Sequence, residues 1–261
     1  KIAVQGQFYI IDRPTAKLDY SLYNEEPMTE NPMNSFVDLS DGKVGLALLN
    51  EGLKGYEVHD DTDCTVSLSL LRGYPLRIFI TEFDISDYSE SDKGSQCLGK
   101  NTFHYAIMPH TGDWEKGDVW SASEKFNLAL HVGLLGPTKH GSQPLEKSFL
   151  ELENDKLHIS AVKKSENGEG WIVRLFNPYN QTIKSAIRLN GGYTGPEKIQ
   201  SPVERVMTEF ELPNDKGRKW AKVRKVTPEE VSVKNFEVNE DGFVNFEIGK
   251  KEILTIEFLP I

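Results

Sequence analysis

Apolar and polar residues alternate along many short segments of this chain, and turn-forming residues separate these segments. Leu157, Ile159 and Ala161 alternate with polar residues, and the same period of two returns in residues 244–248 and 254–258. Because successive side chains of a strand point to opposite faces of a sheet, this spacing predicts half-buried strands. Further strands are expected at residues 1–11, 102–108, 171–176 and 231–238, with a core strand at residues 65–71. The pattern predicts an all-β fold of antiparallel β-sandwiches.

The clearest hairpin lies within residues 32–58. Phe36 and Val37 are strong strand formers, and the following Ser-Asp-Gly at residues 40–42 is typical of a tight turn. Residues 46–49 are then entirely apolar. We therefore expect the second strand of this hairpin to be buried on both faces, inside a larger β-structure.

One short helix and one domain boundary complete the predicted architecture. Val119, Ala122 and Phe126 recur near helical spacing, which predicts a helix over residues 118–128. Residues 133–144 hold three Gly and two Pro and are the best candidate for a boundary. We expect a central β-sandwich region over residues 1–145, incomplete at its N-terminal end because its first strand begins abruptly, and a C-terminal β-sandwich over residues 146–261.

Composition narrows the possible partners. The chain has 261 residues with 40 acidic and 30 basic side chains, a formal net charge of −10. Phosphate binding needs clustered positive charge, so neither nucleic acid nor an anionic membrane is expected as a partner. No apolar run approaches the roughly 20 residues that cross a bilayer. Cys64 and Cys97 are the only cysteines, and we expect them to be free and buried, although one disulfide is possible.

The motifs of common enzymes are not found in the sequence. There is no G-x-S-x-G nucleophile motif and no phosphate-binding loop, and the six histidines lack metal-ligand spacing. We therefore assign no catalytic residue and no metal ligand. The acidic residues at 59–63 and 84–92 are interpreted as a solvated turn and an exposed loop, in preference to calcium sites. Core packing is favoured over a sugar-stacking platform for the four tryptophans, which are Trp114, Trp120, Trp171 and Trp220.

Two side chains at predicted strand ends are candidates for a site. His110 follows a predicted strand, where a turn histidine bonded to the backbone is the simpler interpretation. Arg72 ends the predicted core strand and could reach into a cleft, but a structural ion pair is the simpler interpretation. Both alternatives remain open from the residues alone.

Several segments, in the same order, resemble the C-terminal β-region of family 38 glycoside hydrolases, the α-mannosidases. Residues 35–58 are similar to the pattern S-F-V-D-x-S-D-G-x-x-G-x-A-x-L-N-x-G-L-x-x-Y-E-V, and residues 68–72 to L-x-L-L-R. Residues 103–112 are similar to F-x-Y-A-x-x-P-H-x-G, and weaker matches follow at residues 148–150 and 159–177. Each motif alone is weak, and their ordered combination is specific.

The resemblance implies a function for the longer enzyme. In that family an N-terminal α/β barrel cleaves α-mannosides with a nucleophilic Asp and an acid/base carboxylate, assisted by zinc that His and Asp side chains hold, and a helical bundle follows the barrel. Nothing in this chain resembles the barrel or the bundle. The resemblance implies a supporting region that packs on both, needs no cofactor itself and shapes the cleft for an α-mannoside, in a cytoplasmic enzyme.

The resemblance also implies a few residues for the cleft. The β-domains of the family can lend an occasional side chain to the sugar, and Asp38, Arg72 and His110 are the candidates here. Residues 73–76 depart from the bacterial members of the family, so the preferred linkage stays open. The rival hypotheses are a free-standing carbohydrate-binding β-sandwich and, with little support, an independent hydrolase.

Overall fold

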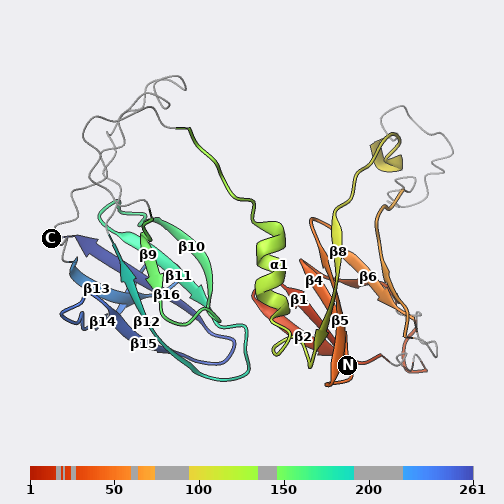
Figure 1. Cartoon of the computed structure of the whole chain (residues 1–261), viewed down its shortest axis with the longest axis horizontal. Coiled ribbons are helices and arrows are strands. Elements are labelled where there is room, and N and C mark those ends of the chain that lie inside the picture. The colour runs from red at the N-terminus through yellow and green to blue at the C-terminus, as the bar shows by residue number, and fades with distance from the viewer. Residues whose placement is uncertain are drawn as a thin grey trace. The chain divides into compact units, whose positions relative to one another are not determined.

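A computed structural model describes residues 1–15, 19, 21–24, 28–59, 64–73, 94–134, 146–190 and 220–260. These residues form antiparallel sheets and a single helix, α1 (Val119–Asn127), which confirms the predicted fold class and the predicted helix. The chain divides into two compact units, Lys1–Val132 and Gly133–Ile261 (Figure 1). The division falls at the start of the Gly- and Pro-rich segment at residues 133–144. Residues 60–63 and 84–92, for which a turn and a loop were predicted, lie outside the described residues.

The described residues of unit 1 form two sheets. Sheet A has the strand order β2-β1-β4-β5-β8, and sheet B has the order β3-β6-β7. Their strands are β1 (Ile2–Gly6), β2 (Tyr9–Arg13), β3 (Asn31–Pro32), β4 (Phe36–Ser40), β5 (Val44–Asn50), β6 (Gly55–Val58), β7 (Val66–Leu68) and β8 (Tyr105–Thr111). A buried cluster joins the two sheets and consists of Ile2, Val4, Met33, Val37, Leu53 and Tyr56.

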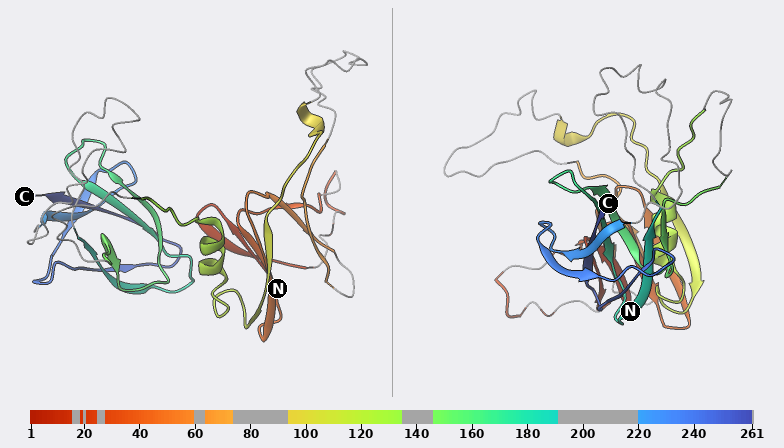
Figure 2. Two further views of the ribbon diagram at one scale, coloured as in Figure 1. Left: turned by 45° about the horizontal axis from the view of Figure 1, so that its top comes forward. Right: turned by 90° about the vertical axis from the view of Figure 1, so that its left-hand side faces the viewer.

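The predicted hairpin is β4 and β5, with Phe36 opposite Leu49. Helix α1 packs on the face of β4 and β5 that carries these two residues (Figure 2), and Trp120 meets the Phe36 ring edge-on at 6.4 Å. The prediction that β5 is buried on both faces is wrong, because Leu46 on its other face is 43% exposed. On this other face of sheet A, the buried cluster shared with sheet B contains residues of β1 and β4. Sheet B therefore covers β1 and β4 more completely than β5.

Two other predicted strands differ from the structure. Residues 1–11 form most of the β1–β2 hairpin, in which Phe8 adopts a left-handed backbone conformation at the turn (φ 58°). The predicted core strand at residues 65–71 is shorter, because β7 is only Val66–Leu68, and Leu70 and Leu71 are exposed.

The two cysteines are free, as predicted, but the prediction that both are buried is wrong. Cys64 is exposed and Cys97 is partly exposed. Both have a left-handed backbone (φ 51° and 50°) outside the strands, at positions that sheet packing does not cover.

In unit 2 the residues that the structure describes also form two sheets. Sheet C has the order β15-β12-β9, and sheet D has the order β10-β11-β16-β13-β14. Their strands are β9 (Leu150–Leu152), β10 (His158–Lys164), β11 (Trp171–Phe176), β12 (Ile183–Leu189), β13 (Trp220–Val226), β14 (Ser232–Phe236), β15 (Val244–Ile248) and β16 (Ile253–Pro260). The last strand, β16, lies in the middle of sheet D.

Strand β16 is more deeply buried than its alternation predicts. The apolar residues Leu254, Ile256 and Phe258 are buried as expected, but Thr255 and Glu257 between them are buried as well. Arg224 on β13 pairs with the Glu257 carboxylate, and Arg174 on β11 donates to the Thr255 hydroxyl. Polar partners on both neighbouring strands therefore allow both faces of the strand to leave water.

Candidate functional site

The structure brings two of the three candidate cleft residues together in unit 1. Asp38 lies on β4 and His110 on β8, and β5 runs between them in sheet A. The register places Gly45 opposite His110 and Ala47 opposite Asp38. Because these two residues are small, the imidazole can lie across β5, and its Nε2 is 2.7 Å from the Asp38 Oδ1.

The Asp38–His110 pair is closed to solvent. The two side chains are 1% and 4% exposed, and the ring lies between two glycines. A Cβ added to Gly45 would lie 2.3 Å from the imidazole Cε1, and one added to Gly117 would lie 2.4 Å from Nδ1. Such distances are far below van der Waals contact, so any larger residue at either position would displace the ring.

The electrostatics of the pair follow from its burial. Burial raises the pKa of Asp38 above its ordinary value of 3.8, and the hydrogen bond and charge of His110 oppose that rise. The nearby carboxylate of Asp113 raises it further. An enclosed pair of this kind can hold a proton and fix the neighbouring backbone, but a substrate has no access to it.

Arg72, the third candidate, belongs to a different cluster beside sheet B. Its guanidinium forms an ion pair with Glu30, which confirms the structural interpretation, and the Ser69 hydroxyl donates to the same carboxylate. The Arg72 side chain is still 60% exposed. It borders an open hollow of about 550 Å³ together with Glu30, Glu57, Leu68, Ser69, Leu70 and Leu71. Of the three candidates, only Arg72 offers polar atoms to a ligand.

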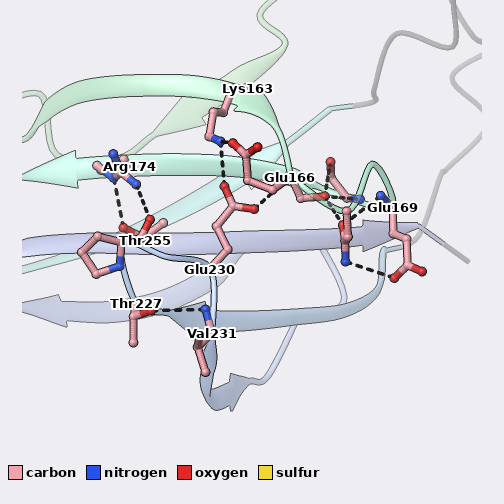
Figure 3. Close-up of polar contacts among 12 residues, drawn as sticks. Lys163, Glu166, Glu169, Arg174, Thr227, Glu230, Val231 and Thr255 are labelled. Atoms are coloured by element: carbon pink, nitrogen blue, oxygen red, sulfur yellow. Dashed lines mark hydrogen bonds and ion pairs between the residues drawn. The ribbon is translucent and has the colours of Figure 1, made fainter.

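Sequence reasoning missed a polar cluster in unit 2 (Figure 3). Glu230, in the turn between β13 and β14, pairs with the Lys163 Nζ at 2.7 Å and accepts a hydrogen bond from the Glu166 amide at 2.6 Å. Although burial opposes it, the contacts with Lys163 and the Glu166 amide hold the pKa of Glu230 below its ordinary value of 4.5. The cluster ties the β13–β14 turn to the β10–β11 turn, a non-local contact that the local pattern could not indicate.

The described residues show no metal-binding cluster, and three of their four tryptophans belong to the core. No three His, Cys, Asp or Glu side chains gather there in a way that could hold a metal ion, so the zinc implied by the resemblance does not fit this part of the chain. Trp114 and Trp120 are buried, and Trp220 packs edge-on against Phe258 at 5.5 Å. These three tryptophans contribute to the core, as predicted, whereas Trp171 on β11 is partly exposed. No described helix has the length and apolar character needed to cross a membrane.

Comparison with known families gives two matches in chain order. The profile described as the glycosyl hydrolases family 38 C-terminal domain matches residues 1–75. The profile described as the glycosyl hydrolases family 38 C-terminal beta sandwich domain matches residues 156–256. The first match covers most of the hairpin region of unit 1, and the second covers most of unit 2.

Individual relatives agree with these profiles. A putative mannosylglycerate hydrolase of Halalkalibacterium halodurans is 26% identical over 180 residues, which is 66% of this chain and 18% of that protein. Human alpha-mannosidase 2C1 is 24% identical over 187 residues, 70% of this chain and 16% of that protein. The chain thus spans less than a fifth of the length of these relatives.

A solved structure shares the fold. The crystal structure of an alpha-mannosidase from Enterococcus faecalis V583 superposes with a TM-score of 0.60 at 21% sequence identity. The superposition covers 98% of this chain and 24% of that protein. At this level of identity the likeness establishes the arrangement of strands.

Proposed function

Because the chain belongs to the C-terminal region of the family 38 glycosyl hydrolases, we propose that it supports an α-mannosidase without cleaving bonds itself. The observation that carries this proposal is the Asp38–His110 pair, whose carboxylate and imidazole are enclosed and engaged with each other. Retaining hydrolysis needs two accessible carboxyl groups about 5–5.5 Å apart, one as nucleophile and one as acid and base. Because Asp38 is buried, it cannot serve as either of these two carboxyl groups.

The catalytic groups would then belong to an N-terminal barrel, followed by a helical bundle, as the resemblance implies. The zinc would be held in that barrel by its own side chains. The partners of this chain would be the barrel and the bundle, with an α-mannoside in the shared cleft. The free Cys64 and Cys97 are consistent with a reducing compartment, so we place the enzyme in the cytoplasm as part of the same proposal.

Within this proposal the three candidate residues have different roles. Arg72 would contact sugar hydroxyls, because its exposed guanidinium borders an open hollow while Glu30 fixes its position. Asp38 and His110 would act indirectly, by positioning the backbone that follows β8. Such contacts orient a substrate, and by themselves they produce no turnover.

The test compares the purified chain with a reconstituted enzyme. The chain alone, assayed with an activated aryl α-mannoside with and without zinc, is expected to show no turnover and no firmly bound metal. Activity is expected only after the N-terminal part of the Halalkalibacterium relative is joined to it. Turnover that follows the isolated chain through the last column would overturn the proposal.

The role of Arg72 is tested in the reconstituted enzyme. Arg72→Met should lower kcat/KM for the α-mannoside through the loss of a charged hydrogen bond, by roughly tenfold or more. Arg188→Met is the matched control, because Arg188 also pairs with a glutamate (Glu151, 2.7 Å) but lies in unit 2. Equal losses in the two variants would refute a substrate contact by Arg72.

A further inference from the structure

The Asp38–His110 pair lies beneath the turn at residues 112–118, which leads from β8 into α1. Two hydrogen bonds hold the first residue of this turn, since the Ser40 hydroxyl donates to the Gly112 carbonyl at 2.8 Å and the Gly112 amide donates to the Lys43 carbonyl at 2.7 Å. At the other end of the turn, Gly117 closes over the imidazole. The turn therefore packs directly on the Asp38–His110 pair.

The start of α1 is held by the turn before it and not by a capping side chain, since the Val119 amide donates to the Trp114 carbonyl at 3.1 Å. Its N-cap residue, Asp118, adopts a left-handed conformation (φ 51°) and makes no side-chain capping hydrogen bond. The first turn of the helix also carries no acidic residue. Since a capping side chain contributes about 1 kcal/mol to a helix end, this end depends on how the preceding turn is held.

We infer that the Asp38–His110 pair is a proton-controlled latch, which holds residues 112–118 and the start of α1 against sheet A. With one proton shared between the carboxylate and the imidazole, the pair carries no net charge. Loss of that proton leaves a single buried negative charge, and gain of a second leaves a single buried positive charge. Either change places net charge where water cannot reach it, and lifting the turn to admit water relieves the penalty.

The surrounding charges set the direction of this response. The Asp113 carboxylate on the turn and the terminal ammonium of Lys1, which donates to the Ser40 carbonyl at 3.1 Å, are the other charged groups that act on Asp38. The Lys1 ammonium opposes retention of the proton, but Asp113 disfavours a second negative charge and therefore favours it. Burial, which raises the pKa of Asp38, acts in the same direction. The latch is thus expected to open as the pH rises and the shared proton is lost.

The packing prevents the pair from adjusting in place. With Gly45 on one side of the ring and Gly117 on the other, the imidazole cannot rotate toward solvent without moving one of these backbones. Gly45 belongs to β5, within sheet A, whereas Gly117 lies in the turn. When the pair is opened to water, we therefore expect the turn to move and sheet A to stay in place.

A second pair in the same unit provides a matched control. His104 and Glu51 have their Nδ1 and Oε2 atoms 2.8 Å apart, but their side chains are 65% and 55% exposed. Water solvates both side chains, so a charge on this pair is not buried and opening a turn would not stabilise it. The two pairs share chemistry and distance and differ in burial.

Amide hydrogen exchange on the full chain tests the latch. Between about pH 6 and about pH 9, after correction for intrinsic rates, protection of residues 112–120 should fall by up to about tenfold per pH unit while the closed pair keeps the proton and the opened pair loses it. Amides of β11 and β16 in unit 2 serve as the internal reference. Asp38→Asn should abolish the pH dependence, and His110→Gln should give low protection at every pH. His104→Gln should reproduce the wild-type profile.

The wild-type profile decides the question even if a variant fails to fold. A protection factor at residues 112–120 that stays constant over this range would overturn the latch. A pH dependence that His104→Gln removes as fully as Asp38→Asn would also overturn it, because the exposed pair would then be responsible.

Discussion

Replacing Arg224 by methionine should destabilise unit 2 far more than the loss of an ordinary ion pair. Arg224 on β13 lies directly opposite Glu257 on β16, and its Nε donates to the Glu257 carboxylate. Glu257 is 1% exposed, and its other cross-strand neighbour, Ile172, is fully buried and apolar. Once Arg224 is gone, the carboxylate has an apolar neighbour on one side and a thioether on the other.

The magnitude follows from this enclosure. Removing one partner of a buried pair costs about 3–5 kcal/mol, since the remaining charge is left unpaired, whereas an exposed pair is worth about 0–1 kcal/mol. Because the Glu257 side chain is only 1% exposed, the range for a buried pair applies. We expect the free energy of unfolding of unit 2 to fall by about 3–5 kcal/mol in Arg224→Met.

Amide exchange of β11 and β16 in the full chain measures this change for unit 2 alone. The slowest amides of these strands should exchange about two to three and a half orders of magnitude faster in Arg224→Met than in the wild type. The control is Lys184→Met, which breaks the exposed Lys184–Glu247 pair at 2.9 Å and should leave these amides unchanged.

A second variant separates the unpaired charge from lost packing. Arg224→Met combined with Glu257→Leu replaces the pair by apolar groups and should return stability to within about 1 kcal/mol of the wild type. If Arg224→Met exchanges within about threefold of the wild type, Glu257 keeps its solvation by another route and the reasoning is refuted. A double variant as unstable as the single one would point to packing instead.

Two further predictions concern other parts of the molecule. Phe36→Ala should destabilise unit 1 by about 3–5 kcal/mol, because a fully buried ring is removed from its contact with Trp120, and a change below about 1 kcal/mol in β4 and β5 amide exchange would contradict this. Glu230→Gln should loosen the β10–β11 turn at neutral pH. The lowered pKa of Glu230 stabilises the fold above its ordinary value of 4.5, and this contribution is lost as the pH falls through the lower folded value. Amide exchange at residues 165–170 should therefore differ between variant and wild type at about pH 7, and the difference should shrink as the pH falls below the ordinary value of 4.5 toward the lower folded value. A difference that stays constant would disprove the role of the charge.

The local pattern was sufficient for elements whose neighbours lie close in the sequence. Phe36, Val37 and the Ser-Asp-Gly turn predicted the β4–β5 hairpin because each of these residues acts within its own few neighbours. The alternation of Val244, Phe246 and Ile248 likewise predicted β15, whose inner residues are buried and whose intervening residues are exposed. In both cases the side chains themselves select the conformation.

Features that depend on contacts between residues far apart in the sequence could not be predicted from the local pattern. The left-handed position of the β1–β2 turn is held by Phe8, where a glycine or asparagine would mark a turn, so β1 and β2 were predicted as one strand. The burial of Glu257 depends on Arg224, 33 residues earlier in the chain. Asp38 was singled out only through the family resemblance. Its contact with His110 requires β4, β5 and β8 to align first.

The position of β16 in sheet D constrains how this protein can be made on the ribosome. Unit 1 pairs β1 with β2 and β4 with β5 between near neighbours, so its hairpins can form while the rest is still being synthesised. In unit 2 the central strand, β16, is translated after the other strands of sheet D. The edges of β11 and β13 that pair with β16 therefore stay unpaired until it has been synthesised. During that interval these edges are open to pairing with other chains, which makes unit 2 more exposed to aggregation than unit 1.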